Sequence, residues 1–300
     1  MQKIEELPNR IVLKNVNKYY GKKQVLSDIN LEINTGMFGL LGRNGAGKTT
    51  MMKAITSILS IESGEINVCN ISQKNPKRIR EIVGYLPQDF SMYPNMSVYE
   101  AMDYLGVLSG LDKKSRQKKI PELLEKVNLQ ENHHTKVKAM SGGMKRRLGI
   151  AQAILHDPRV LIVDEPTAGL DPEERVRFRN LLSEIAKDRI VILSTHIVGD
   201  IEATCEKIAI MEEGRIVFDG TVSRLLEQAR GKIYEVTISR SEIDEMKQNY
   251  IITNMLMLSA EAKIRFIAEN PETSMKAAVE AIPNVEDAYM YFMHRTGGDR

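Results

Sequence analysis

The stretch Gly42-Arg43-Asn44-Gly45-Ala46-Gly47-Lys48-Thr49 decides the fold of this chain. It has the spacing of a phosphate-binding P-loop: a glycine, four residues, then glycine, lysine and threonine. The apolar residues Met37 to Leu41 predict a strand before the loop, and Thr50 to Ile55 predict a helix after it. In that setting the loop's N–H groups and the helix N-terminus converge on one anion. A chance glycine-rich turn is disfavoured, because strand, loop and helix occur in the right order.

The bulk composition predicts a globular protein with one large domain and a smaller one. Of the 300 residues, 42% are hydrophobic. The chain has 42 basic and 40 acidic side chains, which give a net charge of +2. This balance gives no global electrostatic reason to expect nucleic acid or an anionic membrane as a partner. We find neither a signal-peptide pattern nor an apolar run that would cross a bilayer. We therefore expect a cytoplasmic protein whose membrane role, if any, comes through a partner.

Two acids follow the most apolar strand of the sequence. Val160 to Val163 is a continuous Val/Leu/Ile run, typical of a strand buried on both faces of a parallel sheet. Carboxylates at its carboxyl end are costly to desolvate unless they serve a cation or a reaction. Asp164 fits a water-mediated Mg²⁺ ligand, and Glu165 fits the general base that activates water for attack on a γ-phosphate. Lys48 would reach the β- and γ-phosphates, and the Thr49 hydroxyl would ligate Mg²⁺.

Three further positions are candidates whose chemistry the pattern alone leaves open. Gln88 follows a predicted strand, Ile82 to Pro87, where it could touch Mg²⁺ and the attacking water or be a polar loop residue. His196 ends the strand that begins at Ile190 and could donate to a γ-phosphate oxygen, although a lone histidine there is usually structural. Tyr20 could stack on a base or be an ordinary tyrosine.

A second possible phosphate site begins at Ser141. This residue is a good N-cap for a helix that continues to Leu155, and Gly142 and Gly143 leave backbone N–H groups open to an anion. A plain Ser-capped helix is the alternative. It is less attractive because two glycines add backbone entropy without a structural gain.

The pattern changes after Gly231 and predicts a small α+β unit without a chemical motif. The expected elements are strands at 233–238, 251–258 and 262–268 and helices at 241–249, 275–282 and 285–293. We interpret this unit as a packing or dimerisation module rather than a ligand sensor.

Together these stretches resemble the nucleotide-binding subunit of an ABC transporter, over about Arg10 to Leu226. The matching motifs, in the family's order, are the A-loop aromatic Tyr20, the Walker A stretch Gly42 to Thr49, the Q-loop Gln88, the signature Met140 to Met144, the Walker B stretch Val160 to Glu165, the D-loop Ala168 to Asp171 and the H-loop His196. Met144 departs from the family's glutamine, which puts in doubt any hydrogen bond that glutamine makes.

The resemblance implies an α/β fold: a P-loop NTPase core with an antiparallel β subdomain, an α-helical subdomain at about 90–148 and a C-terminal extension at 231–300 after a domain at 1–230. ATP and Mg²⁺ are the implied cofactors. The implied catalytic residues are Glu165, His196, Lys48 and Gln88, and the implied metal ligands are Thr49, Gln88 and Asp164. The implied nucleotide contacts are Tyr20, Gly42, Arg43, Asn44, Gly45, Ala46, Gly47, Lys48, Thr49 and Thr50, with Ser141, Gly142 and Gly143 acting from a second subunit.

The sequence at about 93–100 and the C-terminal extension resemble those of subunits of ABC-2-type exporters. This implies an ATPase, peripheral on the inner face of the cell membrane, that energises export of a drug, antibiotic, polysaccharide or ion through a separate permease. It implies a head-to-tail pair with a second copy or a related subunit. The alternative is a soluble ABC ATPase acting on ribosomes or nucleic acid, which the single P-loop, the lack of a heptad run and the balanced charge argue against.

Overall fold

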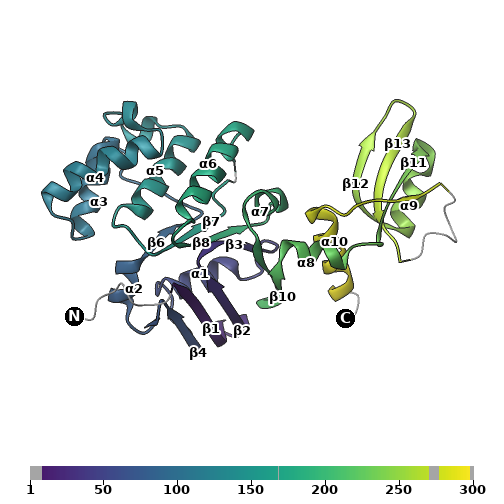
Figure 1. The fold of residues 1–300 in the computed structure, drawn as a ribbon, viewed down its shortest axis with the longest axis horizontal. Coiled ribbons are helices and arrows are strands. Elements are labelled where there is room, and N and C mark those ends of the chain that lie inside the picture. Colours follow the sequence, from purple (N-terminus) through teal and green to yellow (C-terminus); the bar gives the residue numbers. More distant parts are fainter. Residues whose placement is uncertain (1–8, 168, 270–276, 298–300) are drawn as a thin grey trace. The chain divides into compact units, whose positions relative to one another are not determined.

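The computed structural model describes residues 9–167, 169–269 and 277–297, which form two compact units, Met1–Asp219 and Gly220–Arg300 (Figure 1). The change of sequence pattern places the boundary later, at about residue 230. The segment between the two positions contains α8 (Val222–Gln228), which packs against α10 (Val285–Gly297) within the second unit.

A six-stranded sheet forms the centre of the first unit. Its order is β10-β9-β3-β8-β7-β6, and β9, β3, β8, β7 and β6 run parallel to one another. The strands are β3 (Gly36–Leu41), β6 (Val83–Leu86), β7 (Val160–Asp164), β8 (Ile190–Thr195), β9 (Lys207–Glu212) and β10 (Arg215–Thr221). All residues of β7 and β8 are buried, as the continuous apolar runs predict. The parallel order brings the carboxyl ends of β3, β7 and β8 to one edge, where such sheets bind ligands.

An antiparallel sheet with the order β2-β1-β4-β5 forms a second layer of this unit. Its strands are β1 (Arg10–Tyr20), β2 (Lys23–Asn34), β4 (Ser63–Val68) and β5 (Ile71–Ser72). One apolar core joins the two sheets through α1 (Lys48–Ile55), since Leu13, Ile29, Met51 and Ile162 all belong to it. The helix that follows the P-loop is therefore anchored on both layers.

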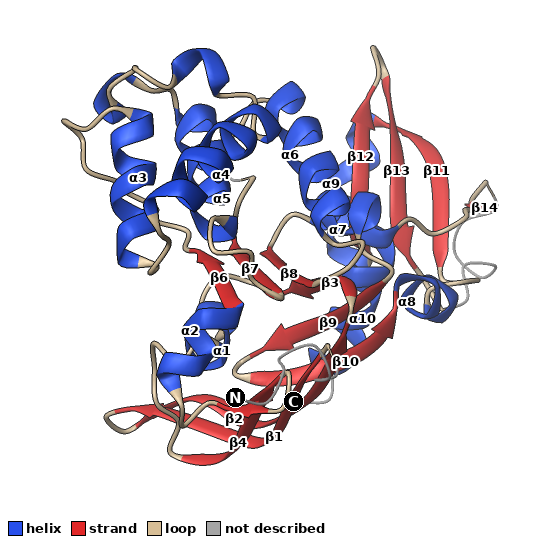
Figure 2. Ribbon diagram, turned by 60° about the vertical axis from the view of Figure 1, so that its left-hand side comes forward, coloured by secondary structure: helices blue, strands red, loops and turns tan. Residues whose placement is uncertain are grey.

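The remaining helices of the first unit surround the central sheet. They are α2 (Pro76–Ile82), α3 (Val98–Leu108), α4 (Lys113–Lys126), α5 (Gly142–Ile154), α6 (Pro172–Ile185) and α7 (Val198–Thr204). Helices α3, α4 and α5 pack on one another, and Figure 2 shows them grouped on one side of this unit. Ser97 and Glu100 start α3 with a capping box. The structure thus confirms the predicted α/β fold class, with its antiparallel β layer and its helical region.

The second unit is a four-stranded antiparallel sheet flanked by helices. It contains α8, β11 (Ile233–Ser239), α9 (Ile243–Asn249), β12 (Ile251–Met257), β13 (Glu261–Ile267), β14 (Val279–Glu280) and α10, with the strand order β12-β13-β11-β14. Val236, Met246, Ile264 and Phe266 form its core with their neighbours.

One predicted helix of the second unit is wrong. The segment 275–282 was expected to be helical, but Val279 and Glu280 form β14 and pair with Glu235 and Tyr234 at the edge of the sheet. Pro283 disfavours helical backbone at the residue before it, and strand pairing outweighs the helix propensity of the alanines and glutamate. The first two residues of the predicted helix, 275 and 276, lie outside the described residues.

None of the helices in the described part of the chain has the length and apolar character to span a bilayer.

Candidate functional site

The P-loop connects β3 to α1, as the sequence predicts. Gly47 is the N-cap of α1 with φ +107°, and a Cβ there would lie 2.8 Å from the Val25 carbonyl oxygen, so this position requires glycine. Because Gly47 has no side chain that could cap the helix, the first-turn N–H groups stay available to a ligand. The local geometry is that of an anion site at a helix N-terminus.

Lys48 lies in the hollow of this loop and is buried. Its Nζ is 2.6 Å from the Gly42 carbonyl oxygen and 3.3 Å from that of Arg43, and 3.4 Å from Glu165 Oε1. The ammonium group thus links the loop to the end of β7. It forms a cationic centre among the loop's N–H groups, which suits a polyphosphate.

Asp164 ends β7 and contacts the first turn of α1. The Thr49 hydroxyl donates to its Oδ2 at 2.7 Å, whereas Oδ1 is buried and accepts no hydrogen bond from the residues that the structure describes. Burial raises the pKa of Asp164, and the neighbouring Thr49 and Ser194 hydroxyls oppose that rise only in part. A buried carboxylate oxygen without a donor is costly, so this site is suited to a cation.

Glu165 and His196 lie together at the ends of two neighbouring strands. Glu165 Oε2 is 2.7 Å from His196 Nδ1, and the Glu165 N–H donates to the Ser194 carbonyl at 2.9 Å. Glu165 is 3% exposed, whereas the His196 side chain is 45% exposed. The histidine therefore holds the carboxylate on one side while its own ring faces outward.

Several predicted site residues line one pocket of about 360 Å³ beside the P-loop. Tyr20 lies there half-exposed, with Gln88 and Glu165. The loop residues Arg43, Asn44, Gly45, Gly47, Lys48, Thr49 and Thr50 complete the predicted part of the lining. Lys23 and Val25 also line the pocket. Neither could be identified from the sequence, because both belong to the alternating pattern of β2 and carry no motif.

The signature residues lie elsewhere. Ser141 caps α5 by accepting from the Met144 N–H, which confirms the predicted N-cap, but Ser141, Gly142 and Gly143 do not line the P-loop pocket. Gly143 instead lies beside Glu174 of α6, to which Arg147 is paired at 3.4 Å. Within one chain, the turn at Ser141 to Gly143 is therefore separate from the pocket beside the P-loop.

A buried pair ties the loop after β7 to α7. The Thr167 hydroxyl donates to Asp200 Oδ2, and both side chains are buried. Arg179 Nη1 is 3.7 Å from the other oxygen of Asp200. The hydrogen bond joins the segment that follows Glu165 to the helix that follows His196. This bond could not be predicted from the sequence, because Thr167 and Asp200 lie far apart along the chain.

The donor set fits Mg²⁺ better than a softer metal. A carboxylate with a free oxygen, a threonine hydroxyl and the Gln88 amide are hard oxygen ligands. Within the described residues, no three His, Cys, Asp or Glu side chains group as a metal site. Since Mg²⁺ typically keeps waters and phosphate oxygens as ligands, two or three protein oxygens are enough.

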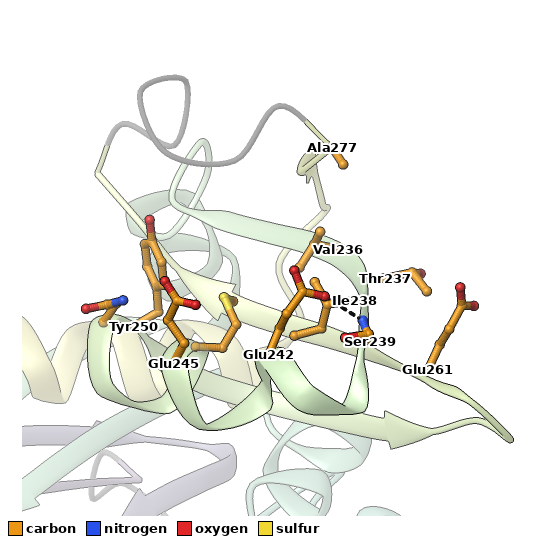
Figure 3. A pocket seen from close by; sticks show the side chains of 11 residues that line it. Val236, Thr237, Ile238, Ser239, Glu242, Glu245, Tyr250, Glu261 and Ala277 are labelled. Atoms are coloured by element: carbon orange, nitrogen blue, oxygen red, sulfur yellow. Dashed lines mark hydrogen bonds between the residues drawn. The ribbon is translucent and has the colours of Figure 1, made fainter.

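A second pocket lies in the C-terminal unit, between α9 and β11 (Figure 3). Its lining includes Glu242, Glu245 and Glu261, and Glu242 accepts from the Ser239 N–H at 2.8 Å. Among the described residues that line it, none is basic. It therefore lacks the positive charge that a phosphate site needs.

The fold and the site define a P-loop nucleotide-binding cassette. Residues 26–168 match the family model described as ABC transporter. The ABC transporter ATP-binding protein YxlF of Bacillus subtilis, which is described as uncharacterized, is 37% identical over 227 residues, covering 75% of this chain and 76% of its own length. The chain belongs to the family of ABC transporter ATP-binding proteins.

Two further relatives have names that point to a process. The linearmycin resistance ATP-binding protein LnrL of Bacillus subtilis is 34% identical, over 75% of this chain and 74% of its own. The Nod factor export ATP-binding protein I of Cupriavidus metallidurans is 35% identical, over 73% of each chain.

Solved structures give the same family. The cbiO1 protein of Clostridium perfringens, described as part of the ABC transporter complex cbiONQ, is 27% identical with a TM-score of 0.67, over 81% of this chain and 96% of its own. The dimeric bacterial ABC transporter cassette MJ0796 is 25% identical with a TM-score of 0.63, over 70% of this chain and 98% of its own.

Proposed function

We propose that this chain hydrolyses ATP and energises export through a separate membrane permease. One observation carries the proposal: Glu165, buried and held between Lys48 and His196, lines the P-loop pocket at the carboxyl edge of the parallel sheet. A buried carboxylate beside a phosphate-type site is suited to activating water rather than to holding the fold together.

Different residues around the pocket would bind the phosphates, the base and Mg²⁺. The P-loop N–H groups and Lys48 hold the phosphates, and the exposed ring of Tyr20 offers a face for the base. Thr49, Asp164 and Gln88 would hold Mg²⁺, which supplies charge neutralisation of the phosphates. Thr49 and Asp164 are already bonded to each other, so the site is preorganised.

The residues at the strand ends carry out the chemistry. Glu165 accepts the proton of the attacking water at Oε1, which makes no hydrogen bond within the described residues and has the Lys48 ammonium 3.4 Å away. His196 orients that carboxylate through its Nδ1 and offers its exposed edge to the γ-phosphate. Lys48 stabilises the negative charge that develops on the phosphoryl oxygens.

The signature residues act in a second subunit. Because Ser141, Gly142 and Gly143 do not line their own chain's pocket, they serve the P-loop of a partner, either a second copy or a related chain. The dimeric cassette among the similar structures supports this arrangement. ATP bound between the two subunits then favours the closed pair, and hydrolysis favours the open one.

Two of the names support the transport role. One similar structure is described as part of an ABC transporter complex, and one relative as a Nod factor export protein. We assign this chain to export through an ABC-2-like permease, with the helical region at about 90–148 facing that permease. The chain would then lie on the inner face of the cell membrane, and nucleic acid would not be its partner.

The Glu165→Gln variant tests this proposal with two readouts. We expect ATP hydrolysis by the purified protein to fall roughly 10²–10⁴-fold. Glu32→Gln is the control, because this carboxylate is exposed and pairs only loosely with Arg10 on β1. The tagged variant, held in its ATP-bound pair, should also retain a permease from mildly solubilised membranes.

Each outcome against the proposal has a clear meaning. Hydrolysis at the wild-type rate would show that Glu165 is not the base. Recovery of ribosomes or nucleic acid instead of a permease would leave the ATPase chemistry in place and remove the transport role.

A further inference from the structure

Arg146 on α5 contacts two backbone segments of the nucleotide site. Its Nη1 donates to the Pro87 carbonyl at 3.1 Å, and its Nη2 lies 3.5 Å from the Glu165 carbonyl. Pro87 directly precedes Gln88, so one guanidinium joins the backbone at both proposed catalytic positions. A planar fork with several donors is suited to such a bridge.

Glu165 needs this support because its backbone is strained. Its φ is +47°, in the left-handed region that non-glycine residues rarely adopt. The Ser194 carbonyl holds its N–H at 2.9 Å, and Arg146 lies against its C=O. The conformation that directs the carboxylate toward Lys48 and His196 is thus fixed from β8 on one side and from α5 on the other.

The charge of Arg146 suits this place. Burial lowers the pKa of Arg146, while Asp89, Asp164 and Glu165 act in the opposite direction. A guanidinium remains protonated in such surroundings. Both hydrogen-bond acceptors are carbonyls, so Arg146 adds positive charge near the acids and leaves the Glu165 carboxylate free to accept a proton.

Helix α5 also carries the signature turn, since Arg146 follows Gly143 by less than one helical turn. We propose that Arg146 is a positioning residue that sets the geometry of Glu165 and Gln88 from the signature helix. This inference rests on the proposed function. Its consequence is a link between two sites: a shift of α5, when Ser141 to Gly143 engage the partner's nucleotide, moves the base of the chain's own site.

The experiment is a double-mutant cycle between Arg146→Ala and Glu165→Gln in the full chain. Arg146→Ala should lower kcat for ATP about tenfold or more, because small misplacements of a catalytic group are costly. The KM for ATP should stay within about twofold, since Arg146 does not line the nucleotide pocket. In the Glu165→Gln background, Arg146→Ala should cause a much smaller loss, because the base is absent and only Gln88 remains to be positioned.

Two more variants separate positioning from folding. Arg146→Lys keeps the charge and one donor group, so it should recover part of kcat and serves if Arg146→Ala folds poorly. Arg189→Ala is the matched control: this half-buried arginine donates to the Pro158 carbonyl at 3.0 Å and does not contact Glu165. It should lower the Tm by a similar amount and leave kcat unchanged.

The possible failures are distinct. Unchanged kcat in both Arg146 variants, or equal losses in the presence and absence of the Glu165 carboxylate, would overturn the positioning role and leave the proposed function standing. Wild-type hydrolysis by Glu165→Gln alone would overturn both, since there would be no base for Arg146 to position.

Discussion

The two units of the chain bury carboxylates in opposite ways. In the second unit, Asp287 accepts from the Thr253 hydroxyl, from Arg265 and from the Asn284 N–H, so both of its oxygens are bonded. In the first unit, Asp164 Oδ1 and Glu165 Oε1 are buried and accept no hydrogen bond within the described residues. Asp287 holds α10 on the sheet, whereas Asp164 keeps an oxygen available to a ligand and Glu165 Oε1 has only an ion pair with Lys48 at 3.4 Å within the described residues.

Whether a buried carboxylate has all of its partners indicates whether its role is structural or functional. A buried charge with all of its hydrogen-bond and ion-pair partners has a structural role, and removing one partner lowers the free energy of unfolding. A buried charge that lacks partners lowers stability in the free protein, and it is retained when a cation or a reacting proton completes it. The two units should therefore respond oppositely to substitution of their acids.

Between Asp164 and Asp287, the larger effect on hydrolysis is expected at Asp164. Asp164→Asn keeps the shape and the Thr49 contact but removes the charge that would hold Mg²⁺, so ATP hydrolysis should fall about 10²–10³-fold. The free energy of unfolding without nucleotide should not decrease, because an unpaired buried charge is lost. Hydrolysis assays and chemical denaturation of both proteins measure this. A variant that is active but less stable would show that Asp164, like Asp287, stabilises the fold and does not serve the reaction.

The pH dependence of stability provides the control for Asp164. Burial raises its pKa in the folded state above the unfolded value of 3.8. A carboxyl with a raised pKa stabilises the fold while protonated, and that contribution is lost as the pH rises through the folded pKa. The Tm advantage of Asp164→Asn over wild type should therefore grow from about pH 4 to pH 8. An advantage that shrinks on that scale would contradict the assignment.

The next effect is expected in the second unit. Asp287→Ala leaves Arg265 and Thr253 without their shared acceptor, so it should cost about 3 kcal/mol of stability. The effect should appear in the unfolding of residues 220–300, followed by hydrogen exchange. Hydrolysis by the purified chain should stay at the wild-type rate. Lost hydrolysis with an intact second unit would show that this acid serves the reaction.

Residues whose positions depend on their neighbours in the sequence could be placed better than residues whose partners lie far along the chain. The P-loop, the acids after β7 and the cap Ser141 each follow from a few neighbouring residues, and the first two meet because parallel strands end at one edge. The roles of Arg146 and Thr167 could not be predicted, because their partners lie far along the chain. Nothing in the basic run 145–147 distinguishes the arginine that faces Glu165 from the one that faces Glu174.

The fold shows the same limit. Long alternating or apolar strands were predicted well, whereas the two-residue β14 was mistaken for a helix. Its identity depends on the free edge of β11, which no pattern within 275–282 reveals. The short helices α2, α7 and α8 were not predicted either, because each is too short to display a clear helical period.

Asp200 is the intermediate case, and it gives the smallest and most informative test. Its Oδ2 is bonded to Thr167, and within the described residues its Oδ1 has only Arg179 Nη1, at 3.7 Å. Thr167→Val keeps the side-chain shape and removes the donor, so stability should fall by about 1–3 kcal/mol. Thr167→Ser should restore most of it, and kcat should change less than about threefold in either variant. Denaturation and steady-state hydrolysis on the same samples decide the matter. A loss of kcat at unchanged stability would show that Asp200 serves the reaction rather than the stability of the fold. The number of hydrogen bonds to a buried carboxylate would then no longer distinguish structural from catalytic acids.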